Sequence, residues 1–154
     1  MGRWTDRLAE LGIPLPEVVT PVADYVPAVR SGSLVFTAGQ VPMVAGEVAA
    51  TGKVGAEISG EEAKQYARIC ALNALAAVDA LVGIDSVVRV VKVVGFVASA
   101  EGFTGQPGVI NGASDLLAEV FGEAGKHARS AVGVAELPLG VPVEVELIVE
   151  VAPG

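Results

Sequence analysis

The sequence has one cysteine and one histidine, Cys70 and His127, among its 154 residues. A single cysteine excludes an internal disulfide and a cysteine metal cluster. A single histidine excludes a histidine-based metal site within one subunit, and we expect His127 to be a surface or interface residue rather than a general base. The glycines match neither the dinucleotide-binding nor the phosphate-loop pattern. The sequence therefore predicts no metal and no cofactor.

Basic residues are also scarce, with 10 Lys and Arg against 18 Asp and Glu, a net charge of −8 and a pI near 4.6. Proteins that bind nucleic acid gain much of their affinity by neutralising phosphates, so this balance argues against a nucleic-acid partner. No run approaches the ~18 apolar residues that span a bilayer. Residues 1–16 carry charges throughout and lack the apolar core of a signal peptide. We expect no membrane partner and a cytoplasmic location.

Apolar residues, by contrast, are abundant. They make up 52% of the chain, and the mean hydropathy is +0.58. This share exceeds that of an ordinary soluble domain, and the excess is mostly valine and alanine. A chain of this length typically forms one domain. We interpret the excess as a dense core plus apolar surface that needs a partner, which favours a homo-oligomer.

Hydrophobic periodicity predicts a mixed order of strands and helices. Ser59 and Glu62 have the spacing of a capping box, and Gly83 is a suitable helix end. Strands are expected over residues 18–30, 33–38, 87–99, 129–137 and 141–151, and helices over 5–11, 59–82 and 109–124. The strand at 18–30 contains two prolines and is expected at a sheet edge, whereas 33–38 is expected to be central and buried on both faces. The predicted fold is an α+β two-layer sandwich, with one mixed or antiparallel sheet and two main helices on one face.

The end of the chain predicts a β-hairpin. Residues 141–151 alternate strictly, with valine and leucine on one face and mostly glutamate on the other. This period of two is typical of a strand with one buried face. Pro138-Leu139-Gly140 provides turn chemistry before it. Residues 129–137 would then pair directly with 141–151.

Arg129 is the most informative charged residue of this segment. Its planar guanidinium suits a carboxylate ligand. In the predicted hairpin it also falls opposite Glu150, so a structural salt bridge is an equally consistent interpretation. Glu144 and Glu146 share one strand face, and the residues alone leave open whether either serves a site.

Four stretches together resemble the RidA family, the reactive-intermediate enamine/imine deaminases formerly called L-PSP endoribonucleases. They are Asp24–Val29 (DYVPAV), Leu34–Pro42 (LVFTAGQVP), Ala128–Pro138 (ARSAVGVAELP) and Val143–Glu146 (VEVE). The resemblance covers roughly residues 18–152. It predicts a RidA-like domain over 18–154, preceded by an N-terminal extension over 1–17.

The resemblance implies a chorismate-mutase-like fold, a homotrimer with sites between subunits, and hydrolysis of 2-imino and 2-enamino acids to 2-oxo acids and ammonia without a metal or cofactor. It implies that Arg129 holds the substrate carboxylate and that Tyr25 lines the pocket from a neighbouring subunit. The backbone at Gly39 would bind the ligand, and Glu144 would help to place the attacking water.

The chain also departs from the family pattern. Ala131 stands two residues after Arg129, at a substrate-binding position where the family often has cysteine. Residues 101–112 form a longer connection between the two main helices than in the family. Either Asn111 or Ser114 fills the place of a pocket asparagine. The divergence keeps a second hypothesis open, a non-catalytic binder or sensor of small carboxylate metabolites. An endoribonuclease is disfavoured by the acidity and by the lack of a histidine pair.

Overall fold

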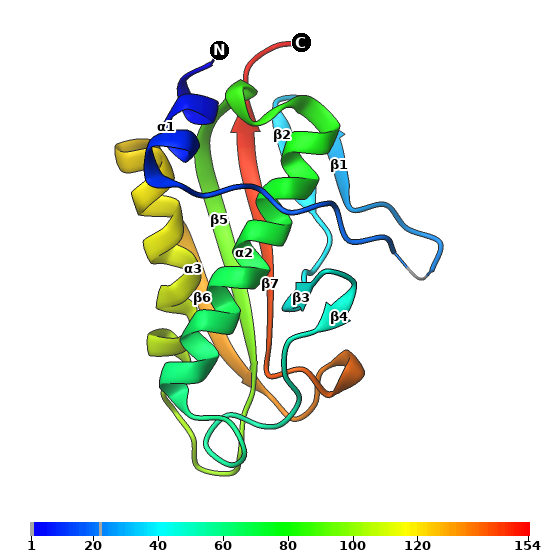
Figure 1. Cartoon of the computed structure of the whole chain (residues 1–154), viewed down its shortest axis with the longest axis vertical. Coiled ribbons are helices and arrows are strands. Elements are labelled where there is room, and N and C mark those ends of the chain that lie inside the picture. Colours follow the sequence, from blue (N-terminus) through cyan, green and yellow to red (C-terminus); the bar gives the residue numbers. More distant parts are fainter. Residues whose placement is uncertain (1, 22) are drawn as a thin grey trace.

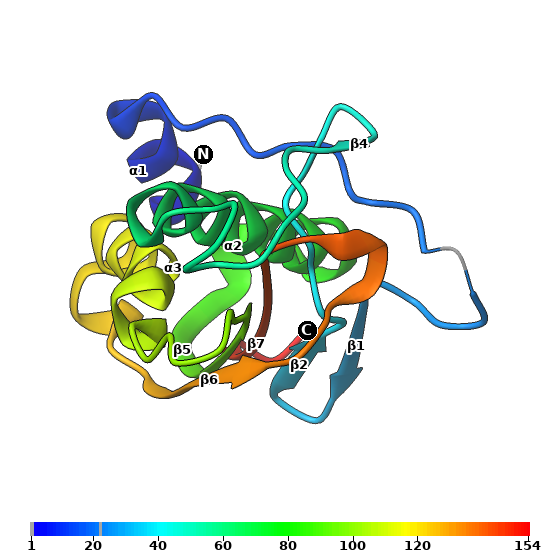
Figure 2. The same cartoon turned by 90° about the horizontal axis from the view of Figure 1, so that it is seen from below.

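The computed structural model describes residues 2–21 and 23–154, which form a five-stranded sheet with helices on one face (Figures 1 and 2). In chain order the elements are α1 (Arg3–Leu11), β1 (Ala28–Ser31), β2 (Leu34–Thr37), β3 (Met43–Val44), β4 (Glu47–Val48), α2 (Gly60–Val82), η1 (Ile84–Ser86), β5 (Val87–Ala98), α3 (Gln106–Phe121), η2 (Gly122–Gly125), β6 (Ala128–Val134), η3 (Pro138–Gly140) and β7 (Val143–Val151). Strands β3 and β4 form a separate small hairpin. The α+β sandwich with one mixed sheet is confirmed.

The sheet has the order β1-β2-β7-β5-β6, so the predicted C-terminal hairpin is wrong. Strand β6 pairs with β5 in parallel, and β7 pairs with β5 antiparallel on its other edge. Strand β5 is the longest strand and is rich in β-branched residues, which favour sheet positions. Strand β5 lies between β6 and β7, the two strands that the local pattern predicts to pair. Residues 135–142 carry the chain across the end of β5 (Figure 1).

The local signals of α2 are confirmed. The Ser59 hydroxyl accepts from the Glu62 N–H at 3.1 Å, and the Glu62 carboxylate accepts from the Ser59 N–H at 3.1 Å. Gly83 ends the helix with φ +81°, a conformation that favours glycine. Helix α3 packs closely on α2, since a Cβ at Gly112 would collide with the Lys64 carbonyl. Both helices therefore form one layer over the sheet.

Strand β7 shows the predicted alternation. Its residues alternate strictly between buried and partly exposed, with the valines and Leu147 under the helices. Two other strand predictions are confirmed in placement, since β1 lies at a sheet edge and β2 lies between two strands, but each is wrong in one detail. The edge strand begins only at Ala28, because Pro21 and Pro27 interrupt ladder pairing. Strand β2 is not buried on both faces, because Phe36 is 37% exposed on the side without helices.

Helix α1 packs against the core. Trp4 and Leu8 are buried, the Trp4 indole N–H donates to the Val87 carbonyl at 2.8 Å, and its ring meets Phe121 edge-on at 4.9 Å. The segment that follows α1 crosses the helical layer before it turns into β1 (Figures 1 and 2). Across residues 2–21 and 23–154, every helix is too short or too polar to cross a membrane.

Candidate functional site

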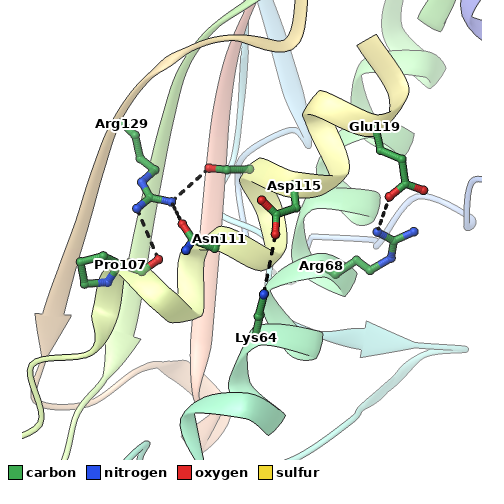
Figure 3. Close-up of polar contacts among 8 residues, drawn as sticks. Lys64, Arg68, Pro107, Asn111, Asp115, Glu119 and Arg129 are labelled. Carbon is green, nitrogen blue, oxygen red and sulfur yellow. Dashed lines mark hydrogen bonds and ion pairs between the residues drawn. The ribbon is translucent and has the colours of Figure 1, made fainter. Parts of the chain in front are cut away.

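Arg129 lies on edge strand β6 and points toward α3. It is paired with Val93 of β5, whose side chain is fully buried under the helices. Its Nη1 donates to Asn111 Oδ1 at 2.8 Å and to Ser114 Oγ at 3.2 Å. Its Nη2 donates to the Pro107 carbonyl at 3.3 Å (Figure 3). Asn111 and Ser114 are three residues apart on one helix face, so both of them, rather than either one, lie beside Arg129.

The alternative salt bridge between Arg129 and Glu150 is wrong. Glu150 lies on β7, opposite Arg89 of β5 and Leu34 of β2, two strands away from β6. The error follows from the predicted hairpin, which had made β6 and β7 neighbours.

The charge of Arg129 is met by neutral groups. Among residues 2–21 and 23–154 no carboxylate lies within ion-pair distance of it. A guanidinium carries five N–H donors, and three of those of Arg129 are used in the bonds to α3. The Nε–H and one Nη2–H remain for a ligand. A partly exposed guanidinium of this kind can bind an anion with two hydrogen bonds.

Ser114 also contacts His127, which the sequence pattern did not indicate. The Ser114 hydroxyl lies 2.8 Å from His127 Nε2, and His127 Nδ1 lies 2.6 Å from the Gly125 carbonyl. Both side chains are partly buried. The predicted helix at residues 109–124 omits the first turn of α3. Its hydrophobic pattern does not predict that the Ser114 side of the helix faces β6. His127 is thus part of a polar network rather than an isolated surface residue.

Gly39 and Glu144 form a second cluster. Gln40 exchanges two backbone hydrogen bonds with Val145 of β7, at 2.8 and 3.0 Å, which holds the preceding glycine beside Glu144. A Cβ at Gly39 would collide with the Glu144 carboxylate. Gly39 is exposed, and within the described part of the chain its backbone N–H and carbonyl make no hydrogen bond. Both groups are therefore available to a ligand.

The Glu144 carboxyl has a perturbed acidity. Partial burial raises its pKa above the ordinary value, and the charge of Glu146, on the same strand face, raises it further. The buried Asn73 of α2 supports this region, since its amide donates to the carbonyls of Val41 and Met43, each at 3.1 Å. No local pattern in the sequence indicates this anchoring role of Asn73.

The two clusters lie on opposite faces of the sheet. Glu144 is paired with Phe96, three residues along β5 from the partner of Arg129, and an odd spacing reverses the face. The structure thus does not bring Arg129 and Glu144 together within one chain. Ala131 is on the Arg129 face, packed against the core. Tyr25 lies in the loop before β1, 52% exposed, with no side-chain hydrogen bond to the described residues of either cluster.

Metal-ligating side chains are dispersed. In the described ranges, no group of three or more His, Cys, Asp or Glu side chains lies close enough to hold a metal ion. The chemistry available at the two clusters is therefore that of one guanidinium, one carboxyl, a serine–histidine pair and free backbone groups.

Comparison with known proteins gives full-length matches. Residues 5–151 match the family model described as "YjgF/chorismate_mutase-like, putative endoribonuclease", so the match includes most of the predicted 1–17 extension. Protein TCP17 of Trypanosoma cruzi is 45% identical over 97% of this chain and 94% of its own length. The crystal structure of Atu1372 from Agrobacterium tumefaciens, a protein of unknown function, is 46% identical, with a TM-score of 0.89 over 97% of this chain and 92% of that one. TdcF of E. coli, solved with bound serine, is 25% identical, with a TM-score of 0.65 over 88% of this chain and 94% of that one.

Proposed function

The chain belongs to the YjgF/chorismate-mutase-like family, to which the RidA proteins also belong, and from that premise we propose that it hydrolyses small 2-imino and 2-enamino acids to 2-oxo acids and ammonia. The observation that carries the proposal is Arg129. Its charge is met only by neutral acceptors in the described residues, and two of its N–H donors remain for a substrate carboxylate.

The chemistry needs few groups. A protonated imine carbon is already electrophilic, so the protein has to orient the acid and position a water molecule. Arg129 would fix the carboxylate, Gly39 would bind the ligand through its backbone, and Glu144 would help to place the water. Partial burial and the charge of Glu146 raise the pKa of this carboxyl, which favours its protonated form. Tyr25 and Ala131 would complete the pocket wall.

We further propose that the site lies between subunits of a homotrimer. Arg129 and Glu144 face opposite sides of the sheet in one chain, so a site that uses both takes them from different copies. The sheet face without helices also exposes apolar side chains, including Val29, Phe36 and Val132. Such an uncovered apolar face is typical of a surface that packs against another copy.

The bound serine of TdcF gives a specific reason to keep the second candidate, a binder of small carboxylate metabolites without catalysis. The same arginine would serve both functions, but only catalysis needs Glu144. An RNA substrate, which the family description suggests, is not part of the proposal, because a net charge of −8 opposes binding to phosphates.

The test couples an amino-acid oxidase to the protein and follows decay of the imine. We expect acceleration by the native protein and a loss of about tenfold to a hundredfold in Arg129→Ala, the size of one or two lost charged hydrogen bonds. Arg68→Ala is the matched control, since that arginine pairs with Glu119 on the outer side of the helices (Figure 3). Unchanged imine decay over several amino acids would contradict the deaminase, and calorimetric binding of 2-oxo acids that depends on Arg129 would then support the binder.

A further inference from the structure

The pair formed by Ser114 and His127 has a defined proton arrangement. A carbonyl oxygen only accepts hydrogen bonds, so the 2.6 Å contact with the Gly125 carbonyl requires His127 Nδ1 to carry a hydrogen. In the neutral ring Nε2 is then an acceptor, and the Ser114 hydroxyl donates to it across 2.8 Å. The backbone at Gly125 thus fixes the tautomer in which the imidazole can receive a proton from the serine.

The Ser114 oxygen also contacts Arg129, the side chain proposed to bind the substrate. A hydroxyl has one donor and two acceptor positions. The donor goes to His127, and one acceptor position takes the Nη1–H of Arg129 at 3.2 Å. One acceptor position is left for a further donor, such as a water molecule. A water held there would lie beside the guanidinium of Arg129, which is proposed to bind the substrate carboxylate.

Glu144 cannot act at this place from the same chain. It lies on the opposite face of the sheet, across β5. Within the described part of one chain, His127 is the proton acceptor that hydrogen bonds connect to Arg129, with Ser114 as the link.

We propose that Ser114 and His127 are the proton-transfer pair of the Arg129 site. The inference rests on the proposed function. The water oxygen bonds to the iminium carbon while a water proton passes to Ser114 Oγ and the serine proton passes to His127 Nε2. The proton then returns through Ser114 to the amine nitrogen, the C–N bond breaks, and ammonia leaves as the carbonyl forms. The last hydroxyl proton is taken up by ammonia, so the products are a 2-oxo acid and ammonium.

Charged side chains other than Arg129 also lie near His127. Arg89 of β5, Lys126 and Glu150 of β7 line a hollow of about 560 Å³ together with His127. Arg129 is the charged group on the α3 side of the ring, reached through Ser114. Of these groups, His127 is the one that hydrogen bonds connect to Arg129 through Ser114.

The test measures imine hydrolysis against pH for the full chain and for Ser114→Ala and His127→Gln. We expect kcat to fall by about a hundredfold in each variant, the usual size of an acid–base contribution. KM should stay nearly unchanged in His127→Gln and rise only a few-fold in Ser114→Ala, because Ser114 is one of three acceptors of Arg129. Because transfer through a proton acceptor depends on pH, the pH dependence of kcat should differ between the native protein and His127→Gln. Asp115→Asn is the neighbouring control, since Asp115 pairs with Lys64 of α2 rather than with β6.

The outcomes separate the two proposals. Native activity with an unchanged kcat and pH profile in folded His127→Gln would overturn the proton-transfer pair and leave the deaminase intact. A parallel loss in both variants, with circular dichroism matching the native protein, would support the pair. An inactive native protein would overturn both proposals.

Discussion

The two polar clusters of this chain differ in how their charge is held. Around Arg129, one rigid helix face supplies the side chains of Asn111 and Ser114 and the Pro107 carbonyl, so the guanidinium is fixed before any ligand binds. In the second cluster, the exposed backbone of Gly39 lies against the Glu144 carboxyl, which is partly buried and has a raised pKa. The Arg129 cluster is suited to bind an anion. The Glu144 cluster presents a carboxyl beside the free backbone groups of Gly39.

The difference also concerns position. The Arg129 cluster is sheltered by α3 at edge strand β6, whereas the Glu144 cluster lies on the sheet face without helices. Residues fixed on opposite faces of a rigid sheet do not meet in one chain. This separation is consistent with the proposed function, in which each cluster is one half of a site shared between copies.

Of three further substitutions that compare the clusters, Asn111→Asp should have the largest effect, and it acts on the first cluster alone. It places a carboxylate at the position that now accepts from Arg129 at 2.8 Å. The new charge competes with the substrate carboxylate, so KM should rise about thirtyfold with a smaller change in kcat. Asn111→Ala removes the acceptor without adding charge and should raise KM only a few-fold. Equal KM values in the two variants would show that Arg129 does not bind the substrate anion.

A smaller effect is expected from Gly39→Ala, which acts on the second cluster. Gly39 has no positive φ, so alanine fits its backbone, but the added Cβ would collide with the Glu144 carboxylate. Displacement of that carboxylate should lower kcat about tenfold while binding through Arg129 persists. Steady-state kinetics check this, with Gly108→Ala, where the added methyl meets open space, as control. A native kcat would remove Glu144 from the proposed chemistry.

The smallest effect is expected from Glu144→Gln on stability. The pKa of this carboxyl is raised, so the folded state favours the protonated form, and ionisation above that pKa opposes folding. The variant should gain stability above the raised pKa and lose that advantage as pH falls below the ordinary carboxyl pKa. The gain should stay below about 0.5 kcal/mol because solvent screens a half-exposed group. Thermal unfolding from pH 3 to 8 measures it, and the opposite trend with pH would contradict the assignment.

The sequence predicts the fold well where the signal is local. The capping box at Ser59, the stop at Gly83 and the alternation of β7 each depend on neighbours along the chain, and each is confirmed. The mixed sheet with both main helices on one face follows from the order of these elements.

The prediction fails for strand pairing, which depends on contacts between segments that are far apart in the sequence. Turn chemistry at Pro138–Gly140 favours a hairpin, but β5 lies between the two strands and pairs with both. That one topological error also produced the false pairing of Arg129 with Glu150. The link from Ser114 to His127 depends on the phase of α3 against β6, which no local pattern in the sequence reveals.

The division of the site between copies is tested most directly by mixing two variants. Arg129→Ala and Glu144→Gln each remove one half of the proposed site, and each alone should lose about tenfold or more in activity. In mixed oligomers purified through two different tags, some sites combine an intact Arg129 from one copy with an intact Glu144 from another. In a cyclic trimer that contains both variants, one of the three sites combines both intact residues, so activity should return to about a third of the native value. Mixed oligomers as inactive as the separate variants would contradict a site shared between copies.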